Sequence, residues 1–260
     1  MRIRAWIIDS AENRNAAAQL REELARYASI AVSGLGLREI GELNIREIPA
    51  EAWETTWRAE FPVTRIGRIV IRPPWSEQAI GVDDAVVTID PGQAFGTGLH
   101  PTTRLALAGI QRWSDAGHLA ALTSDGVGML DVGTGSGILL AAALQLGASH
   151  GSGIDTDPLA VEAARRNLLQ NGLASRSRVL LGTLPFHTPA QLVVANLVAA
   201  LQIELAPQLA AALTEDGRLL VSGIFIDRET ETVDALLRSG LRLEGRWEEG
   251  EWVALEWTHG

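Results

Sequence analysis

A glycine-rich turn followed by an acidic residue constrains this chain more than any other feature. The turn, Asp131-Val-Gly-Thr-Gly-Ser-Gly137, follows an apolar run and precedes a helical pattern, and Asp155 ends the next apolar run. A strand, a glycine turn, a helix and a second strand ending in an acid form one half of a nucleotide-binding α/β sheet. Glycine lets a ligand approach the backbone because it has no Cβ, and the acid can accept from two ribose hydroxyls. The pattern predicts a nucleotide-like ligand.

The spacing of the glycines narrows the ligand class. A dinucleotide-binding turn requires G-x-G-x-x-G, whereas Ile138 occupies the third glycine position and the chain reads G-x-G-x-G from Gly133 to Gly137. The pyrophosphate of a dinucleotide would sit at the helix N-terminus behind that third glycine. The turn therefore disfavours a nicotinamide-dependent oxidoreductase and favours a ligand without a pyrophosphate.

The composition is that of an ordinary globular protein and argues against several other classes. The 260 residues are 47% hydrophobic and 21% charged, and without cysteine they offer no disulfide and no thiolate metal site. We find no signal peptide and no bilayer-spanning stretch, so a cytoplasmic protein without membrane contact is expected. A net charge of −10 without a basic stripe disfavours direct nucleic-acid binding, but it is compatible with a basic protein partner.

Alternating strand and helix patterns predict a Rossmann-like α/β domain over residues 91–260, built on a mostly parallel sheet. Expected strands cover 129–133, 151–155, 178–182, 191–196 and 218–223, and expected helices lie near 137–147, 158–171, 199–213 and 228–239. A final strand pair near 241–248 and 251–257 predicts one antiparallel edge strand. The segment 114–128 is expected to be an irregular loop.

The first ninety residues are expected to form two smaller parts. Residues 1–60 are predicted to be a small α+β domain, and residues 61–90 a linker with strands that lead into the core. Within these parts, strand patterns cover 2–9, 68–72 and 85–89, and helical patterns cover 14–27 and 50–60.

A second glycine-rich segment, Ala94-Phe-Gly-Thr-Gly-Leu-His-Pro-Thr-Thr103, precedes the core. Pro101 predicts the first turn of a helix, where free N–H groups suit a carboxylate. A generic loop and helix cap would explain the proline and threonines but not the glycines around Phe95, so we interpret the segment as functional. His100 could act as a base, but a capping or packing histidine is favoured.

Polar residues at the ends of expected strands complete the candidate site. Asn196 ends an apolar strand, and the carboxyl ends of parallel strands line the ligand crevice of such sheets. Its amide can accept from an amine and donate to a partner, with simple turn formation as the alternative. Asp131 either hydrogen-bonds within its own turn or meets an ammonium group. Asp157 precedes Pro158 and is interpreted as a helix cap.

These segments together resemble the bacterial ribosomal protein L11 methyltransferase (PrmA) family, within the class I S-adenosylmethionine-dependent methyltransferases. Residues 94–103 resemble the family's motif before the core, and residues 131–138 resemble its motif I. The similarity covers roughly residues 50–257, through the segments 153–158, 167–172, 194–197 and 222–224. The N-terminal part is shorter than is usual in the family, and 114–128 is longer.

The resemblance implies an enzyme that moves methyl groups from S-adenosylmethionine to lysine side-chain or N-terminal α-amino groups of ribosomal protein L11. The domain at 1–60 would recognise this partner, a monomer is expected, and no metal is implied. Two alternatives stay open: a methyltransferase of another protein or a small amine, and a non-catalytic cofactor-binding assembly factor. By the resemblance, the cofactor contacts are Thr103, Gly133, Asp155 and Asn196. Asn196 is the catalytic candidate, and the two glycine-rich segments add Phe95, Gly96, Asp131 and Gly135 as cofactor-binding candidates.

Overall fold

The computed structural model describes residues 62–90, 98–122 and 127–260, all of which belong to one compact unit, Arg58–Gly260. The expected α+β domain at 1–60, with its strand and helices, lies outside the described residues. The segments 91–97 and 123–126 do so as well.

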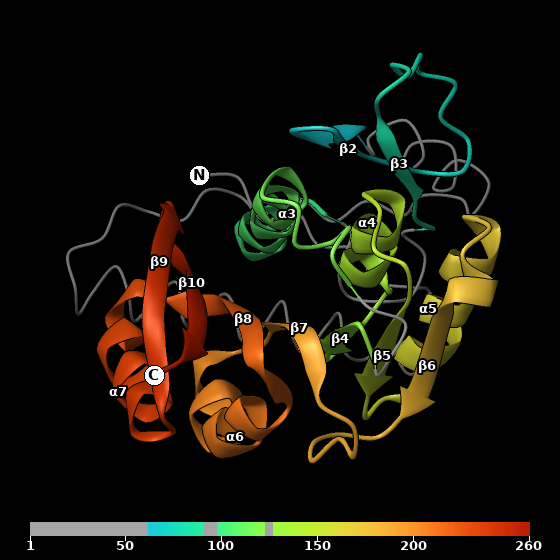
Figure 1. Cartoon of the computed structure of the whole chain (residues 1–260). Helices are drawn as coiled ribbons and strands as arrows, with labels where there is room; N and C mark the ends of the chain where they lie inside the picture. The colour runs from blue at the N-terminus through green and yellow to red at the C-terminus, as the bar shows by residue number, and fades with distance from the viewer. Residues whose placement is uncertain (1–61, 91–97, 123–126) are drawn as a thin grey trace, which may run out of the picture. The chain divides into compact units, whose positions relative to one another are not determined.

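A seven-stranded sheet forms the centre of this unit (Figure 1), in the order β6-β5-β4-β7-β8-β10-β9. The first five strands in that order are parallel, and β10 is antiparallel to both β8 and β9. The expected mostly parallel sheet with one antiparallel strand is confirmed, and that strand, β10, lies next to the edge strand β9. The strands are β4 (Met129–Val132), β5 (Gly151–Asp155), β6 (Ser177–Leu181), β7 (Ala190–Asn196), β8 (Leu213–Phe225), β9 (Leu241–Glu249) and β10 (Trp252–His259).

Helices cover both faces of the sheet because the central strands are apolar on both sides. Along β7, Leu192 and Val194 pack into one core cluster, while Val193 and Ala195 pack into the other. Helices α3, α4 and α5 contribute to the first cluster, and α6 and α7 contribute to the second, on the opposite face (Figure 1). The helices are α3 (Pro101–Asp115), α4 (Ile138–Gln145), α5 (Pro158–Gln170), α6 (Ala199–Ala211) and α7 (Glu229–Arg238).

A second, three-stranded sheet precedes the core and packs against α3 and α4. Strand β2 (Ile69–Arg72) pairs with β1 (Thr64–Ile66) and β3 (Ala85–Thr88). Ile69, Ile71 and Val87 are buried in the same cluster as α3 and α4. The strands expected at 68–72 and 85–89 are confirmed. β1, with only three residues, has too short a pattern to be detected.

Two further segments differ from the sequence-based expectation. The helix that begins at Pro101 continues to Asp115, so the expected loop at 114–128 starts slightly later. β8 begins at Leu213, well before the apolar run at 218–223, and its pairing with β7 shifts register between Ala190 and Leu192. None of the helices in the described part of the chain has the length and apolar character needed to traverse a bilayer.

Candidate active site

The glycine turn lies where β4 ends and α4 begins. Gly133, Gly135 and Gly137 all have positive φ angles, of 72°, 54° and 78°. A residue with a side chain would be strained in this conformation. A Cβ on Gly133 would also lie 2.4 Å from Cδ2 of Leu197, the residue after the candidate Asn196. These three positions are thus kept free of side chains, and Gly133 lies against Leu197, just after the end of β7, so the two predicted parts of the site are adjacent.

The carboxylate of Asp155 is oriented by two backbone amides at the end of β5. Its Oδ2 accepts a hydrogen bond from the Gly135 N–H at 2.9 Å, and its Oδ1 accepts from the Asp157 N–H at 3.0 Å. These two hydrogen bonds fix the orientation of the carboxylate. Each of its oxygens can accept one further hydrogen bond. This arrangement suits two neighbouring hydroxyls of a ribose.

Asp157, two residues later, has a different role. It is the N-cap of α5, its Oδ1 accepts from the Leu159 N–H at 2.8 Å, and Pro158 occupies the first turn. The interpretation of Asp157 as a structural cap is confirmed.

Asp131 is fully buried under the turn. Thr134 Oγ1 donates to its Oδ2 at 2.7 Å, whereas Oδ1 has no hydrogen-bond partner among the described residues. Burial raises the pKa of Asp131 to about 7, against the lowering effects of the Thr134 side chain and the Leu140 backbone. A buried carboxylate with an unpaired oxygen is costly. The Thr134 hydrogen bond realises the first of the two roles left open by the sequence, a contact within its own turn, and Oδ1 remains as the acceptor that an ammonium group would need.

Thr103 and Asn196 come from distant parts of the chain and meet at the rim of the sheet. Thr103 lies in the first turn of α3 and is 3% exposed, and Asn196 is the last residue of β7. The Asn196 Nδ2 donates to Thr103 Oγ1 at 3.4 Å. With Nδ2 directed at the threonine, the Asn196 Oδ1 is the acceptor that remains for a ligand.

The second glycine-rich segment is described only from Gly98 onward, so Phe95 and Gly96 lie outside the described residues. His100 is the N-cap of α3. Its Nδ1 lies 3.4 Å from the Thr102 amide nitrogen and 2.8 Å from Thr102 Oγ1. Its ring also packs edge-on against Trp252, with centroids 4.9 Å apart. The favoured reading of a capping and packing histidine is confirmed.

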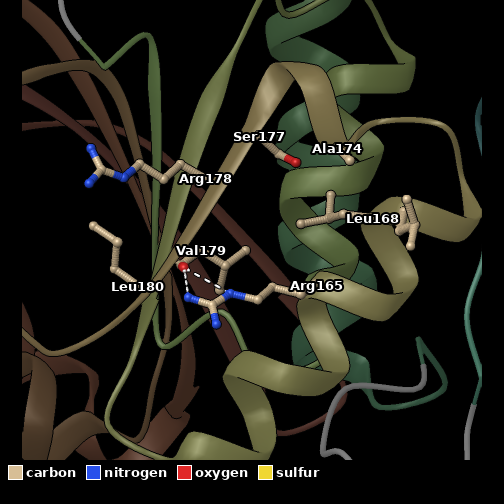
Figure 2. A pocket seen from close by; sticks show the side chains of 8 residues that line it. Arg165, Leu168, Ala174, Ser177, Arg178, Val179 and Leu180 are labelled. Carbon is tan, nitrogen blue, oxygen red and sulfur yellow. Dashed lines mark hydrogen bonds between the residues drawn. The ribbon is translucent and has the colours of Figure 1, made fainter.

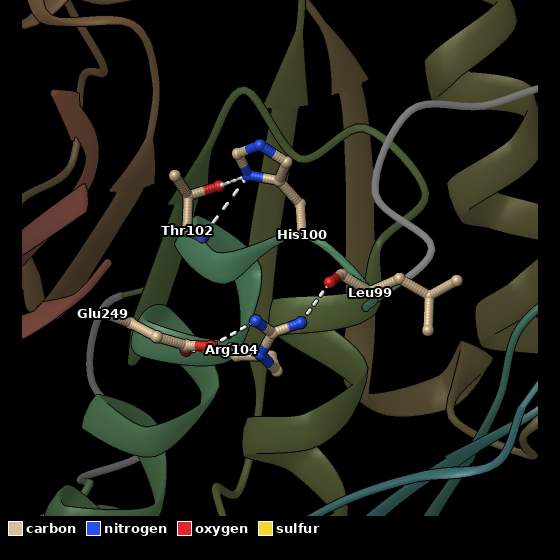
Figure 3. Close-up of polar contacts among 5 residues, drawn as sticks. All are labelled: Leu99, His100, Thr102, Arg104 and Glu249. Carbon is tan, nitrogen blue, oxygen red and sulfur yellow. Dashed lines mark hydrogen bonds and ion pairs between the residues drawn. The ribbon is translucent and has the colours of Figure 1, made fainter. Parts of the chain in front are cut away.

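An ion pair that the sequence analysis missed ties the start of α3 to the β9–β10 hairpin (Figure 3). Arg104 forms a salt bridge with Glu249, with Nε 2.9 Å from Oε1, and its Nη1 donates to the Leu99 carbonyl. Because 145 residues separate the two partners, no local pattern could have indicated the pair. The entry to α3, which carries Thr103, is thereby anchored to the far edge of the sheet.

A surface hollow lies elsewhere, at the outer edge of the sheet (Figure 2). It has a volume of about 420 Å³ and is formed by α5, β6 and the short helix Ala174–Arg176 between them. Arg165 crosses it and donates through Nη2 to the Val179 carbonyl at 2.6 Å, capping the free edge of β6. None of the predicted site residues lines this hollow. The hollow is therefore not part of the candidate site, which lies at the rim of the sheet. Within the described ranges, no group of three or more acidic or histidine side chains could hold a metal ion.

Comparisons with known proteins agree with this geometry. The family model described as "Ribosomal protein L11 methyltransferase (PrmA)" matches residues 2–259. A ribosomal protein L11 methyltransferase of Geobacter metallireducens is 41% identical over 220 residues, which cover 84% of this chain and 69% of that protein. One of Chloroflexus aurantiacus is 39% identical over 246 residues, which cover 84% and 72%.

A solved structure has the same fold. The crystal structure of ribosomal protein L11 methylase from Lactobacillus delbrueckii subsp. bulgaricus superposes with a TM-score of 0.66 at 31% identity. The match covers 76% of this chain and 98% of that one. With this fold and these matches, the chain belongs to the ribosomal protein L11 methyltransferase (PrmA) family and is a class I methyltransferase.

Proposed function

We propose that this enzyme transfers methyl groups from S-adenosylmethionine to amino groups of ribosomal protein L11, on lysine side chains, the N-terminal α-amino group or both. One observation carries the proposal. The glycine turn, the oriented carboxylate of Asp155 and the amide of Asn196 meet at the same rim of the sheet. The names of the relatives supply the substrate.

The residues at the rim suit the parts of the proposed cofactor. Asp155 presents two acceptors to the ribose hydroxyls, and the positive-φ glycines of the turn leave the backbone accessible. Asp131 Oδ1, buried without a hydrogen-bond partner among the described residues, suits the ammonium of the methionine part. The N-terminal turn of α3 at Thr103 suits its carboxylate. Phe95 and Gly96 complete the proposed cofactor contacts on the strength of the family resemblance.

Asn196 holds the target amine in this proposal. When bound, the cofactor supplies a methyl group on a positively charged sulfur. An amine accepts that group only in its neutral form, aligned with the methyl carbon at about 3–3.5 Å. Neutralising a lysine at pH 7 costs roughly 4.6 kcal/mol and an α-amino group about 1 kcal/mol. Asn196 Oδ1 accepts a hydrogen bond from the amine N–H and thereby directs the lone pair of the amine at the methyl carbon. In this proposal the transfer uses no dedicated base.

The surface beside Asn196 suits a protein substrate. Val198, Leu201 and Ile226 follow the carboxyl ends of β7 and β8 and are exposed by 61%, 43% and 45%. Exposed apolar residues bordered by polar ones are typical of sites that bind another protein. The net charge of −10 attracts a basic partner and disfavours direct RNA contact. Recognition by the 1–60 domain, a monomeric state and a cytoplasmic location belong to the same proposal and stay predictions.

The decisive experiment measures methyl transfer from S-adenosylmethionine into purified, unmethylated ribosomal protein L11 and into unmethylated ribosomes, read by intact mass. Increments of single methyl groups on L11 are expected, and the Asn196→Ala variant is the control. Incorporation into another protein or a small amine instead would retain the methyltransferase activity and change the proposed substrate. Cofactor binding without transfer to any acceptor would favour the non-catalytic assembly factor.

A further inference from the structure

A glutamine that has no part in the proposed chemistry lies directly behind the candidate catalytic asparagine. Gln202, in the first turns of α6, is completely buried. Its Nε2 donates to two backbone carbonyls, those of Leu197 and Ser222, both at 2.6 Å. Its Oε1 has no hydrogen-bond partner among the described residues. The opposite amide orientation would place Oε1 against two carbonyl oxygens, so the orientation is settled by its partners.

Ser222 connects the same point to α3. It is also completely buried, its Oγ donates to the Thr102 carbonyl at 2.8 Å, and its carbonyl accepts the Leu197 N–H at 3.0 Å. Ser222 thus joins the end of β8 both to the turn that follows Asn196 and to the first turn of α3, which carries Thr103. Three elements far apart in the sequence are linked by one buried group of polar contacts.

Gly223 lets these elements approach closely. Its φ is +91°, and a Cβ at this position would lie 2.3 Å from the Leu197 carbonyl oxygen and 3.1 Å from Asn196 Oδ1. The Leu197 carbonyl is therefore pressed against β8 and engaged by Gln202. It faces the protein interior, which leaves Asn196 Oδ1 as the acceptor for an incoming amine at this strand end.

We propose that Gln202 and Ser222 are positioning residues that set the place of Asn196 relative to Thr103. The inference rests on the proposed function, in which Asn196 holds the amine. The side chain of Asn196 has a single described hydrogen bond, and at 3.4 Å it is long. The position of Asn196 is therefore set mainly by the backbone around it, which Gln202 and Ser222 hold. Misplacement of a substrate-holding group by about 1 Å can slow a reaction about a hundredfold.

The test replaces Gln202 by Met, which has similar length but no donor, and compares it with Gln111→Met. Gln111 controls for the loss of a buried, hydrogen-bonded glutamine outside the site. It is also buried, and it also makes two hydrogen bonds, accepting from the Arg68 N–H at 3.0 Å and donating to Asp115 Oδ1 at 2.8 Å. Arg68 lies between β1 and β2 and Asp115 is the last residue of α3, so these contacts are away from the rim. Both variants remove two hydrogen bonds from one buried glutamine.

Gln202→Met is expected to lower kcat about tenfold or more, with the cofactor Kd measured by calorimetry unchanged within about twofold. Gln111→Met is expected to lower Tm comparably and to leave kcat unchanged. In an Asn196→Ala background, Gln202→Met should cause no further loss of kcat, because Gln202 acts through Asn196. Full activity of Gln202→Met, or an equal loss in Gln111→Met, would overturn the inference.

Two further outcomes distinguish a failure of the positioning role from a failure of the proposed function. If the wild-type enzyme transfers no methyl group to any acceptor while binding the cofactor, the proposed function fails and the positioning role fails with it. If Gln202→Met does not fold, Ser222→Ala provides the same test, because it removes only the hydroxyl that donates to Thr102. That variant should lower kcat by a larger factor than it weakens cofactor binding, and unchanged kcat would contradict the proposal.

Discussion

The two halves of the candidate site are built in opposite ways. Most of the cofactor half lies within one strand-turn-helix-strand unit, from Asp131 to Asp155, whose contacts are short range in sequence. Only the proposed contacts at Phe95, Gly96 and Thr103 come from outside this unit. The amine half is assembled from the first turn of α3, the ends of β7 and β8 and the first turns of α6, and Asn196 lies 93 residues from its partner Thr103. The first half is a local structure, and the second exists only when the whole sheet has formed.

This difference predicts how each half responds to substitution. In the cofactor half, a single side chain or glycine carries each role, so a change should affect cofactor binding and little else. In the amine half, buried hydrogen bonds between elements keep Asn196 in place, so changes outside the rim should slow transfer without weakening cofactor binding.

The largest expected effect is on the pH dependence of stability and arises from Asp131. Its folded pKa is raised to about 7 by burial, against a usual value of 3.8. Between about pH 4 and pH 7 the folded state holds a proton that the unfolded state releases, so stability falls as pH rises through this window. The fall is of the order of 4 kcal/mol at most.

Denaturant titrations of the wild type and Asp131→Asn across pH 4–8 measure this effect. Because the asparagine does not titrate, the variant should gain stability relative to the wild type as pH rises. S-adenosylmethionine should reduce the difference if its ammonium pairs with Asp131. Parallel pH profiles for the two proteins would show that the Asp131 carboxyl titrates normally.

Asn196→Ala is the strongest test of the amine half. The substitution removes the proposed acceptor of the amine, and we expect kcat to fall roughly a hundredfold. Cofactor binding, measured by calorimetry, should change little because Asp155 and the turn are intact. An equal loss of binding and transfer would make Asn196 a cofactor ligand only and would erase the proposed distinction between the halves.

Asp155→Ala is the corresponding test of the cofactor half, with Asp157→Ala as its matched control. Hydrogen bonds to a charged group contribute about 1.5–3 kcal/mol, so Asp155→Ala should weaken cofactor binding about tenfold or more. Asp157 caps α5, and no ligand contact is proposed for its side chain, so its loss should cost about 1 kcal/mol of stability without changing the cofactor Kd. Unchanged binding in Asp155→Ala would remove it from the site.

The local nature of the cofactor half also explains why it could be predicted from sequence. Positive-φ glycines, an acid at a strand end and a proline after a capping aspartate are signals contained in a few residues. The structure has the predicted strands and helices of the core, and it places Asp157 and His100 as caps. The roles of Asp155, Asp131 and the glycines in binding remain predictions, although their geometry suits them.

The amine half could be predicted only at Asn196 and Thr103, whose strand end and helix start are visible in the sequence. Gln202 is the fourth residue of a largely apolar helix, where a glutamine normally indicates an exposed position, yet it is completely buried. Ser222 lies near the end of β8, and nothing in the local sequence indicates that its hydroxyl reaches the Thr102 carbonyl, 120 residues away. Such contacts depend on strand order and helix packing, which short patterns do not encode.

The smallest expected effect concerns the ion pair between Arg104 and Glu249, which extends the amine half to the β9–β10 hairpin. Both side chains are about one-third exposed, so Arg104→Met should cost no more than about 1 kcal/mol of stability. The exposed pair of Arg166 with Glu162 on α5 is the control. Because Arg104 also holds the Leu99 carbonyl next to α3, its loss should lower kcat/KM for L11 about twofold, whereas Arg166→Met should not. Identical kinetics in the two variants would confine the amine half to the contacts around Asn196, with the hairpin serving stability alone.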